Sequence, residues 1–123
     1  MLLAVNGTLM RGLELNQNLI DAGAEFVKEA KTKGEYRLFS INDEHPAMYK
    51  VKEGGNEIKV EIWEIGDKGL VDVLQKEPAG LCIGKIELND GSILLGVLGE
   101  EIICKGMKEI TEHGGWKEYI KTK

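Results

Sequence analysis

The residues with the clearest chemical potential form a short loop near the start of the chain, over residues 6–12 (Asn-Gly-Thr-Leu-Met-Arg-Gly). The loop directly follows an apolar run, Leu2–Val5, and has glycine at its second and last positions. Glycine relaxes the steric limits on the backbone, so successive N–H groups in such a loop can converge on an anion. The pattern indicates a site for a carboxylate or an oxyanion. The alternative is a plain strand-to-helix turn in which Gly7 takes a positive φ.

Other reactive residue types suggest no second site. His45 lies in a polar turn and His113 precedes a Gly-Gly pair, so we expect both to be exposed or to cap a helix. Cys82 and Cys104 match no metal-binding spacing, and no His-x-x-His or Glu-x-x-His occurs. We therefore expect no metal and no cofactor. Cys82 lies in an apolar segment and is expected to be buried.

Composition limits the class of protein. A chain of 123 residues, 42% hydrophobic and 30% charged, predicts one globular domain over residues 1–123. The net charge is −5 and the lysines alternate with glutamates, so a nucleic-acid partner is not expected. The apolar stretches are too short to span a membrane, and no secretion signal is recognisable. Two unpaired thiols fit a reducing, cytoplasmic location. Composition leaves open whether the chain forms a homo-oligomer.

Hydrophobic periodicity and turn residues predict the elements that position the loop. A hairpin is expected around Asn89-Asp90-Gly91, and another connection of this kind over 54–56. The predicted strands are 2–5, 24–32, 35–41, 47–52, 57–65, 81–88 and 92–98, and the predicted helices are 13–22, 68–76 and 116–121, with a short helix or loop over 100–108. Several strands with a few short helices predict an α+β fold whose sheet curls or closes into a small mixed β-barrel.

Three segments resemble a known superfamily. The first loop is similar to the Tyr-Gly-Ser/Thr-Leu loop of gamma-glutamylcyclotransferase-like proteins, with Asn6 in place of the tyrosine. Residues 81–91 and 110–119 resemble the C-terminal domain of allophanate hydrolases, a branch of the same superfamily, and this likeness covers nearly the whole chain. The resemblance implies a small mixed barrel with helices around it and a cavity at the first loop.

The resemblance also implies which residues bind a substrate. In the superfamily the first loop holds the carboxylate end of a small molecule. Arg11 would add a cation or be solvated at the loop tip, and Arg37 would either clamp a carboxylate or pair with Glu61. The implied binding residues are Asn6, Gly7, Thr8, Leu9, Met10, Arg11, Tyr36 and Arg37.

The general base that each branch uses has no clear counterpart. Cyclotransferases carry a glutamate three residues before a proline, and alignment on Pro78 puts Gln75 there. Glu77 could substitute if the register shifts. The histidine of the allophanate branch falls at Thr8 or Leu9, and neither can act as a base. Of the other carboxylates in matching segments, Glu61 and Glu100 could line the cavity.

Three functions follow from the resemblance. The first is a small-molecule enzyme or former enzyme that binds a carboxylated amide or carbamate. It would resemble the allophanate hydrolase domain that acts on N-carboxycarbamate and releases carbon dioxide, beside a separate amidase. The second is a cyclotransferase-like enzyme that releases 5-oxoproline. The third is a non-catalytic module that binds a small ligand.

Overall fold

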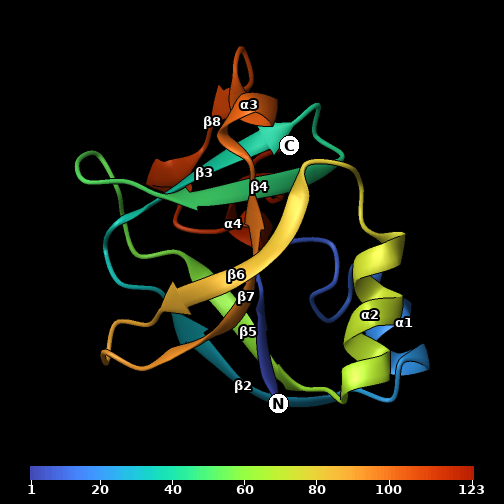
Figure 1. The fold of residues 1–123 in the computed structure, drawn as a ribbon. Helices are drawn as coiled ribbons and strands as arrows, with labels where there is room; N and C mark the ends of the chain where they lie inside the picture. Colours follow the sequence, from blue (N-terminus) through green and yellow to red (C-terminus); the bar gives the residue numbers. More distant parts are fainter.

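The computed structural model describes residues 1–123 and contains strands and a few short helices (Figure 1). The strands are β1 Leu2–Val5, β2 Glu25–Lys31, β3 Tyr36–Ile41, β4 His45–Lys50, β5 Lys59–Glu64, β6 Leu81–Glu87, β7 Ile93–Gly99 and β8 Lys108–Glu109. The α-helices are α1 Asn16–Asp21, α2 Asp67–Lys76, α3 Glu101–Cys104 and α4 Trp116–Ile120, and a 3₁₀ turn covers Thr111–His113.

Two sheets build the fold. The larger sheet has the order β2-β5-β1-β7-β6, and the smaller one has the order β4-β3-β8. The α+β class is confirmed, but the strands are divided between these two sheets and do not close into one barrel. Strand β1 lies at the centre of the larger sheet, antiparallel to β5 and parallel to β7. Figure 1 shows the smaller sheet crossing one end of the larger sheet. Helices α1 and α2 lie beside the larger sheet.

The core explains why β1 is central. Its residues Leu3, Ala4 and Val5 are buried, as expected for an apolar strand with a partner on each side. Helix α4 packs Trp116 and Tyr119 into the same core. The loop that follows β1 therefore starts from one of the most constrained points of the molecule.

Sequence-based boundaries agree with most elements within a few residues, and two turns differ. The predicted hairpin over 54–56 is wrong, because β4 and β5 belong to different sheets and do not pair. Strand β4 also begins at His45 and not after Pro46, since the turn is confined to the residues before it. Asn42 and Asp43 make that tight turn with positive φ values of 54° and 58°, a conformation that Asn and Asp tolerate.

Cys82 is exposed, so its predicted burial is wrong. Strand β6 is an edge strand of the larger sheet, and alternate residues of a strand point to opposite faces. An apolar run such as 81–83 therefore does not require every side chain to be buried. Cys104 is the buried thiol, and none of the helices has the length and hydropathy that crossing a membrane requires.

Candidate active site

The first loop is held in place by hydrogen bonds that leave part of its backbone free. The Asn6 side chain donates to the Val97 carbonyl of β7 at 2.9 Å, and the Asn16 side chain donates to the Leu9 carbonyl at 2.8 Å. The Met10 N–H donates to the Gly7 carbonyl at 2.9 Å and closes a tight turn. The N–H groups of Gly7, Thr8 and Leu9 donate to no acceptor in the protein. This is the row of backbone donors that a carboxylate requires.

Gly7 is required by a close approach and not by a positive φ. A Cβ atom at this position would lie 2.5 Å from Cδ of Pro46, which is near the beginning of β4. The interpretation of Gly7 as a positive-φ turn residue is therefore wrong, since its φ is not in the left-handed region. Direct packing of the loop on β4 brings residues of the smaller sheet to the first loop.

A cavity of about 20 Å³ lies between the loop and β4. This volume is close to the space that one water molecule occupies, so without movement of its walls the cavity admits only the carboxyl end of a ligand. Its lining contains just two titratable side chains, Glu77 and His45. The lining residues are Val5, Asn6, Gly7, Thr8, Leu9, His45, Pro46, Glu77, Leu81 and Val97.

Glu77 is the carboxylate that the structure brings to the loop. It follows α2 directly, and its N–H donates to the Leu74 carbonyl at 3.2 Å and ends the helix. Burial raises the pKa of Glu77 to about 7, because a low-dielectric environment disfavours the charged carboxylate. A pKa near neutral pH suits a group that must both donate and accept a proton. Gln75, which the proline alignment places at the catalytic position, is exposed on α2.

His45 reaches the same cavity from β4 and is half-buried, although its sequence context suggested an exposed or capping residue. Its Nδ1 lies 3.0 Å from the Pro46 carbonyl oxygen. A carbonyl only accepts hydrogen bonds, so Nδ1 carries the proton and Nε2 of the neutral ring holds a free lone pair. The sequence contains no local signal for this position, because the pairing of β4 with β3 creates it.

Glu61 anchors the loop from the other side. Its carboxylate accepts the Arg11 N–H at 2.9 Å and the indole N–H of Trp63 at 3.2 Å. Nε of Arg11 and Nζ of Lys117 each lie 3.2 Å from the second oxygen. Burial alone would raise the pKa of Glu61, but these donors outweigh it and lower the pKa. Glu61 thus stays ionised, and both of its carboxylate oxygens already accept hydrogen bonds. This suits a residue that anchors the loop better than a general base.

Arg11 lies outside the cavity. Its guanidinium stacks over the Phe26 ring at 3.6 Å from the centroid and pairs with Glu29 at 3.4 Å as well as with Glu61. Its side chain is 44% exposed, and its role as a ligand-binding cation stays a prediction. The guanidinium fastens the end of the loop to β2 and β5.

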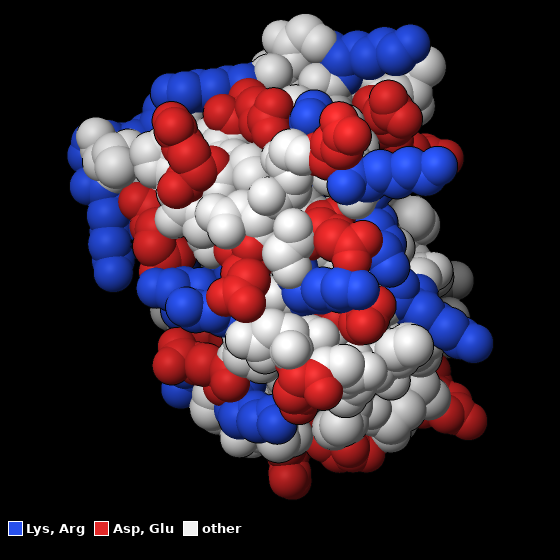
Figure 2. All heavy atoms as spheres, turned by 90° about the vertical axis from the view of Figure 1, so that its left-hand side faces the viewer, with Lys and Arg blue, Asp and Glu red and all other residues white.

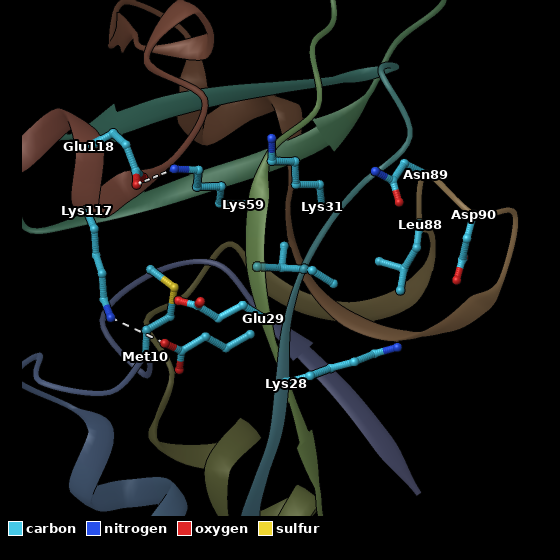
Figure 3. A pocket seen from close by; sticks show the side chains of 13 residues that line it. Met10, Lys28, Glu29, Lys31, Lys59, Leu88, Asn89, Asp90, Lys117 and Glu118 are labelled. Carbon is cyan, nitrogen blue, oxygen red and sulfur yellow. Dashed lines mark hydrogen bonds and ion pairs between the residues drawn. The ribbon is translucent and has the colours of Figure 1, made fainter.

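A second, larger hollow of about 480 Å³ lies on that side of the loop (Figure 3). Lysines and carboxylates alternate around it, and Figure 3 marks the pair Lys59–Glu118. Lys117 also pairs with Glu61. The same interspersed charge covers the face shown in Figure 2. The hollow is larger than the first-loop cavity, but the positive charges of its lysines are balanced by the negative charges of its carboxylates. It is lined by Met10, Lys28, Glu29, Ala30, Lys31, Lys59, Val60, Glu61, Leu88, Asn89, Asp90, Lys117 and Glu118.

The other candidate residues lie elsewhere. Tyr36 is buried, and its hydroxyl accepts the Glu87 N–H at 3.0 Å, which connects the two sheets. Arg37 donates to the Glu53 carbonyl and lies 3.8 Å from the Glu109 carboxylate, so it pairs with neither a cavity residue nor Glu61. Glu100 is exposed before α3. No group of three or more potential metal ligands occurs.

Comparison with known proteins gives one family. The family model described as allophanate hydrolase C-terminal domain matches residues 1–121. The urea amidolyase of Lachancea kluyveri is 30% identical over a match that covers 96% of this chain. The chain spans only 7% of the length of that protein. The relative is thus a much larger protein that contains a domain like this one.

Solved structures agree with this assignment. A uropathogenic E. coli-specific protein is 56% identical with a TM-score of 0.96, covering 98% of this chain and 94% of its own. The allophanate hydrolase of Kluyveromyces lactis is 29% identical with a TM-score of 0.92, covering 98% of this chain and 21% of that enzyme. An AIG2-like protein of Mus musculus, 19% identical with a TM-score of 0.62, covers 80% of this chain and 75% of its own, and shares the fold.

Proposed function

We propose that this chain, which belongs to the allophanate hydrolase C-terminal domain family, binds a small carboxylated amide or carbamate at the first-loop cavity and transfers a proton to it. One observation carries the proposal: the free N–H groups of Gly7, Thr8 and Leu9 share a cavity with Glu77, whose pKa is raised to about 7. Each charge-assisted bond from a backbone N–H to a carboxylate contributes about 1.5–3 kcal/mol. The loop thus binds one end of the ligand, and Glu77 acts on the adjacent atoms.

N-carboxycarbamate is the substrate that best suits this arrangement. One carboxylate of the dianion accepts the loop N–H groups, and neutral Glu77 donates its proton to the bridging nitrogen. The bond between this nitrogen and the other carboxyl carbon breaks, its electron pair goes to nitrogen, and carbon dioxide leaves. Carbamate remains, and the proton that Glu77 lost is recovered from solvent. A carboxyl group that is part-neutral at pH 7 can perform this step, whereas an ordinary glutamate is almost fully ionised.

The same observation supports a second candidate, a cyclotransferase that releases 5-oxoproline. In that reaction ionised Glu77 takes a proton from the substrate α-amine and passes it to the leaving amide nitrogen. Both reactions need a carboxyl group close to the loop that binds the substrate carboxylate. They differ in the ligand, so ligand binding distinguishes them.

An amidase is the partner that the first reaction implies. The K. lactis relative is an allophanate hydrolase of which this chain matches 21%. In the proposed division of labour a separate amidase releases N-carboxycarbamate, and this chain consumes it.

A thermal-shift panel tests the proposal. Malonate serves as a stable dicarboxylate mimic and is compared with gamma-glutamyl amides and dipeptides. A ligand present at 100 times its Kd stabilises a protein by about 2.7 kcal/mol, or several degrees for a domain of this size. Stabilisation by malonate alone supports the first function, and stabilisation by gamma-glutamyl compounds alone supports the second. No stabilisation by either class would refute both.

Two variants connect binding to chemistry. Glu77→Gln imitates the neutral carboxyl, so malonate should still stabilise it while release of carbon dioxide from N-carboxycarbamate, generated in situ by an amidase, is lost. Glu14→Gln removes an exposed carboxylate that lies outside the cavity lining and should behave as wild type. Equal turnover in the two variants would exclude Glu77 as the proton donor.

A further inference from the structure

We infer that His45 is a second proton-carrying side chain of the first-loop cavity and forms an acid–base pair with Glu77. The structure supplies an imidazole to the same cavity from a different element, the first residue of β4. The role of this pair in turnover rests on the proposed function, whereas the position of both side chains on one cavity does not.

Glu77 and His45 are the two titratable side chains that line the first-loop cavity. The segment from α2 to β6 carries Glu77 past the beginning of β4 (Figure 1), and both side chains line one cavity. From the neighbouring strands, Ile41 pairs with His45 in the β3–β4 register, and Val97 lines the cavity from β7. The loop presents only Asn6 to Leu9. Glu44, the residue before His45, is exposed and does not line the cavity.

The hydrogen bond of the ring defines which nitrogen carries protons. Nδ1–H is occupied by the Pro46 carbonyl at 3.0 Å, so Nε2 is the nitrogen that exchanges protons. Glu77 loses a proton to the substrate nitrogen in the proposed step. Protonated His45 then returns a proton to the Glu77 carboxylate and takes one from solvent. The sum of these steps consumes one solvent proton for each carbon dioxide released, as the reaction requires.

Nitrogen NMR of the His45 ring tests the pair without any turnover. We expect Nδ1 to carry the proton whenever the ring is neutral, and an Nε2 resonance whose pH titration curve is displaced by Glu77→Gln. The matched control Glu44→Gln removes the adjacent exposed carboxylate and should displace the curve less. A curve that is unchanged in Glu77→Gln, or that responds more strongly to Glu44→Gln, overturns the inference.

A second variant tests the role in turnover. Asparagine can keep a donor to the Pro46 carbonyl but lacks the equivalent of Nε2, so His45→Asn removes the proposed function of the ring with little change in packing. We expect kcat to fall about 100-fold, the usual effect of losing an acid–base group, with KM changed much less. Added imidazole should restore part of the activity of His45→Gly. Full activity of His45→Asn with normal malonate binding would overturn the inference and leave the proposed function intact. If malonate does not bind but Glu77→Gln still displaces the His45 titration curve, the proposed function is refuted and the inference stands.

Discussion

Glu61 is the residue whose chemistry depends most on its neighbours. A carboxylate with only 2% of its side chain exposed would be costly alone, but four donors from Arg11, Trp63 and Lys117 surround it. The main effect of the Glu61 carboxylate is mechanical. It ties the Arg11 backbone, and so the end of the first loop, to β5. Disruption of a buried pair leaves the partner charges uncompensated.

We predict that Glu61→Gln destabilises the protein by about 2–4 kcal/mol, because the amide cannot accept all the donors that the carboxylate accepts. Urea unfolding measures the change. The control is Glu29→Gln, which removes an exposed carboxylate that pairs with the same Arg11 at 3.4 Å. Its effect should remain within about 0.5 kcal/mol. Equal losses in the two variants would contradict the anchoring role.

At the scale of elements, the approach of the first loop to β4 creates the cavity. The two segments are far apart in the sequence, and they touch where Gly7 meets Pro46. A side chain at position 7 must displace either the loop or the strand, because Pro46 is rigid and paired with Ser40 in the smaller sheet.

We predict that Gly7→Ala costs about 1–3 kcal/mol of stability, as overpacking usually does, and abolishes stabilisation by malonate. Thermal unfolding with and without malonate measures both effects. Gly34→Ala is the matched control, since a Cβ there meets nothing within 4 Å and its φ is not positive. Normal malonate binding by Gly7→Ala would show that the loop does not need this approach to β4.

At the scale of the whole molecule, the titrating carboxyl groups act in opposite directions on stability. The pKa of Glu77 is raised from 4.5 to about 7, so its favourable contribution is complete below pH 4.5 and is lost as the pH rises through 7. The hydrogen bonds from Lys123, Ser40 and Tyr119 hold the pKa of Asp43 well below its ordinary 3.8. Asp43 therefore stabilises the fold above pH 3.8, and its contribution is lost on further acidification.

We predict that between about pH 5 and pH 8 the wild type loses stability relative to Glu77→Gln by roughly 2 kcal/mol, after allowance for the partial exposure of the carboxyl. Urea unfolding across this range measures the difference. Glu14→Gln should run parallel to the wild type. Parallel curves for wild type and Glu77→Gln would mean that Glu77 titrates as an ordinary exposed carboxyl.

The sequence by itself determined the local structure and the loop. The buried strand over 2–5, the helix before Pro78 and the hairpin around Asn89-Asp90-Gly91 follow from short-range patterns, and the structure confirms them. The expectation that the glycine-containing loop offers free N–H groups is local too, and the hydrogen bonds agree with it. Periodicity and turn chemistry act over a few residues, so one sequence is enough to recognise them.

Only the tertiary structure decided which side chains meet at the loop. Glu77 rather than Gln75 faces the cavity, His45 joins it from the smaller sheet, and Arg37 pairs with Glu109 and not with Glu61. The predicted hairpin over 54–56 failed for the same reason, since strand pairing between distant segments assigned β4 and β5 to different sheets. Such contacts depend on sheet order and on how two sheets pack, and no short-range pattern encodes either.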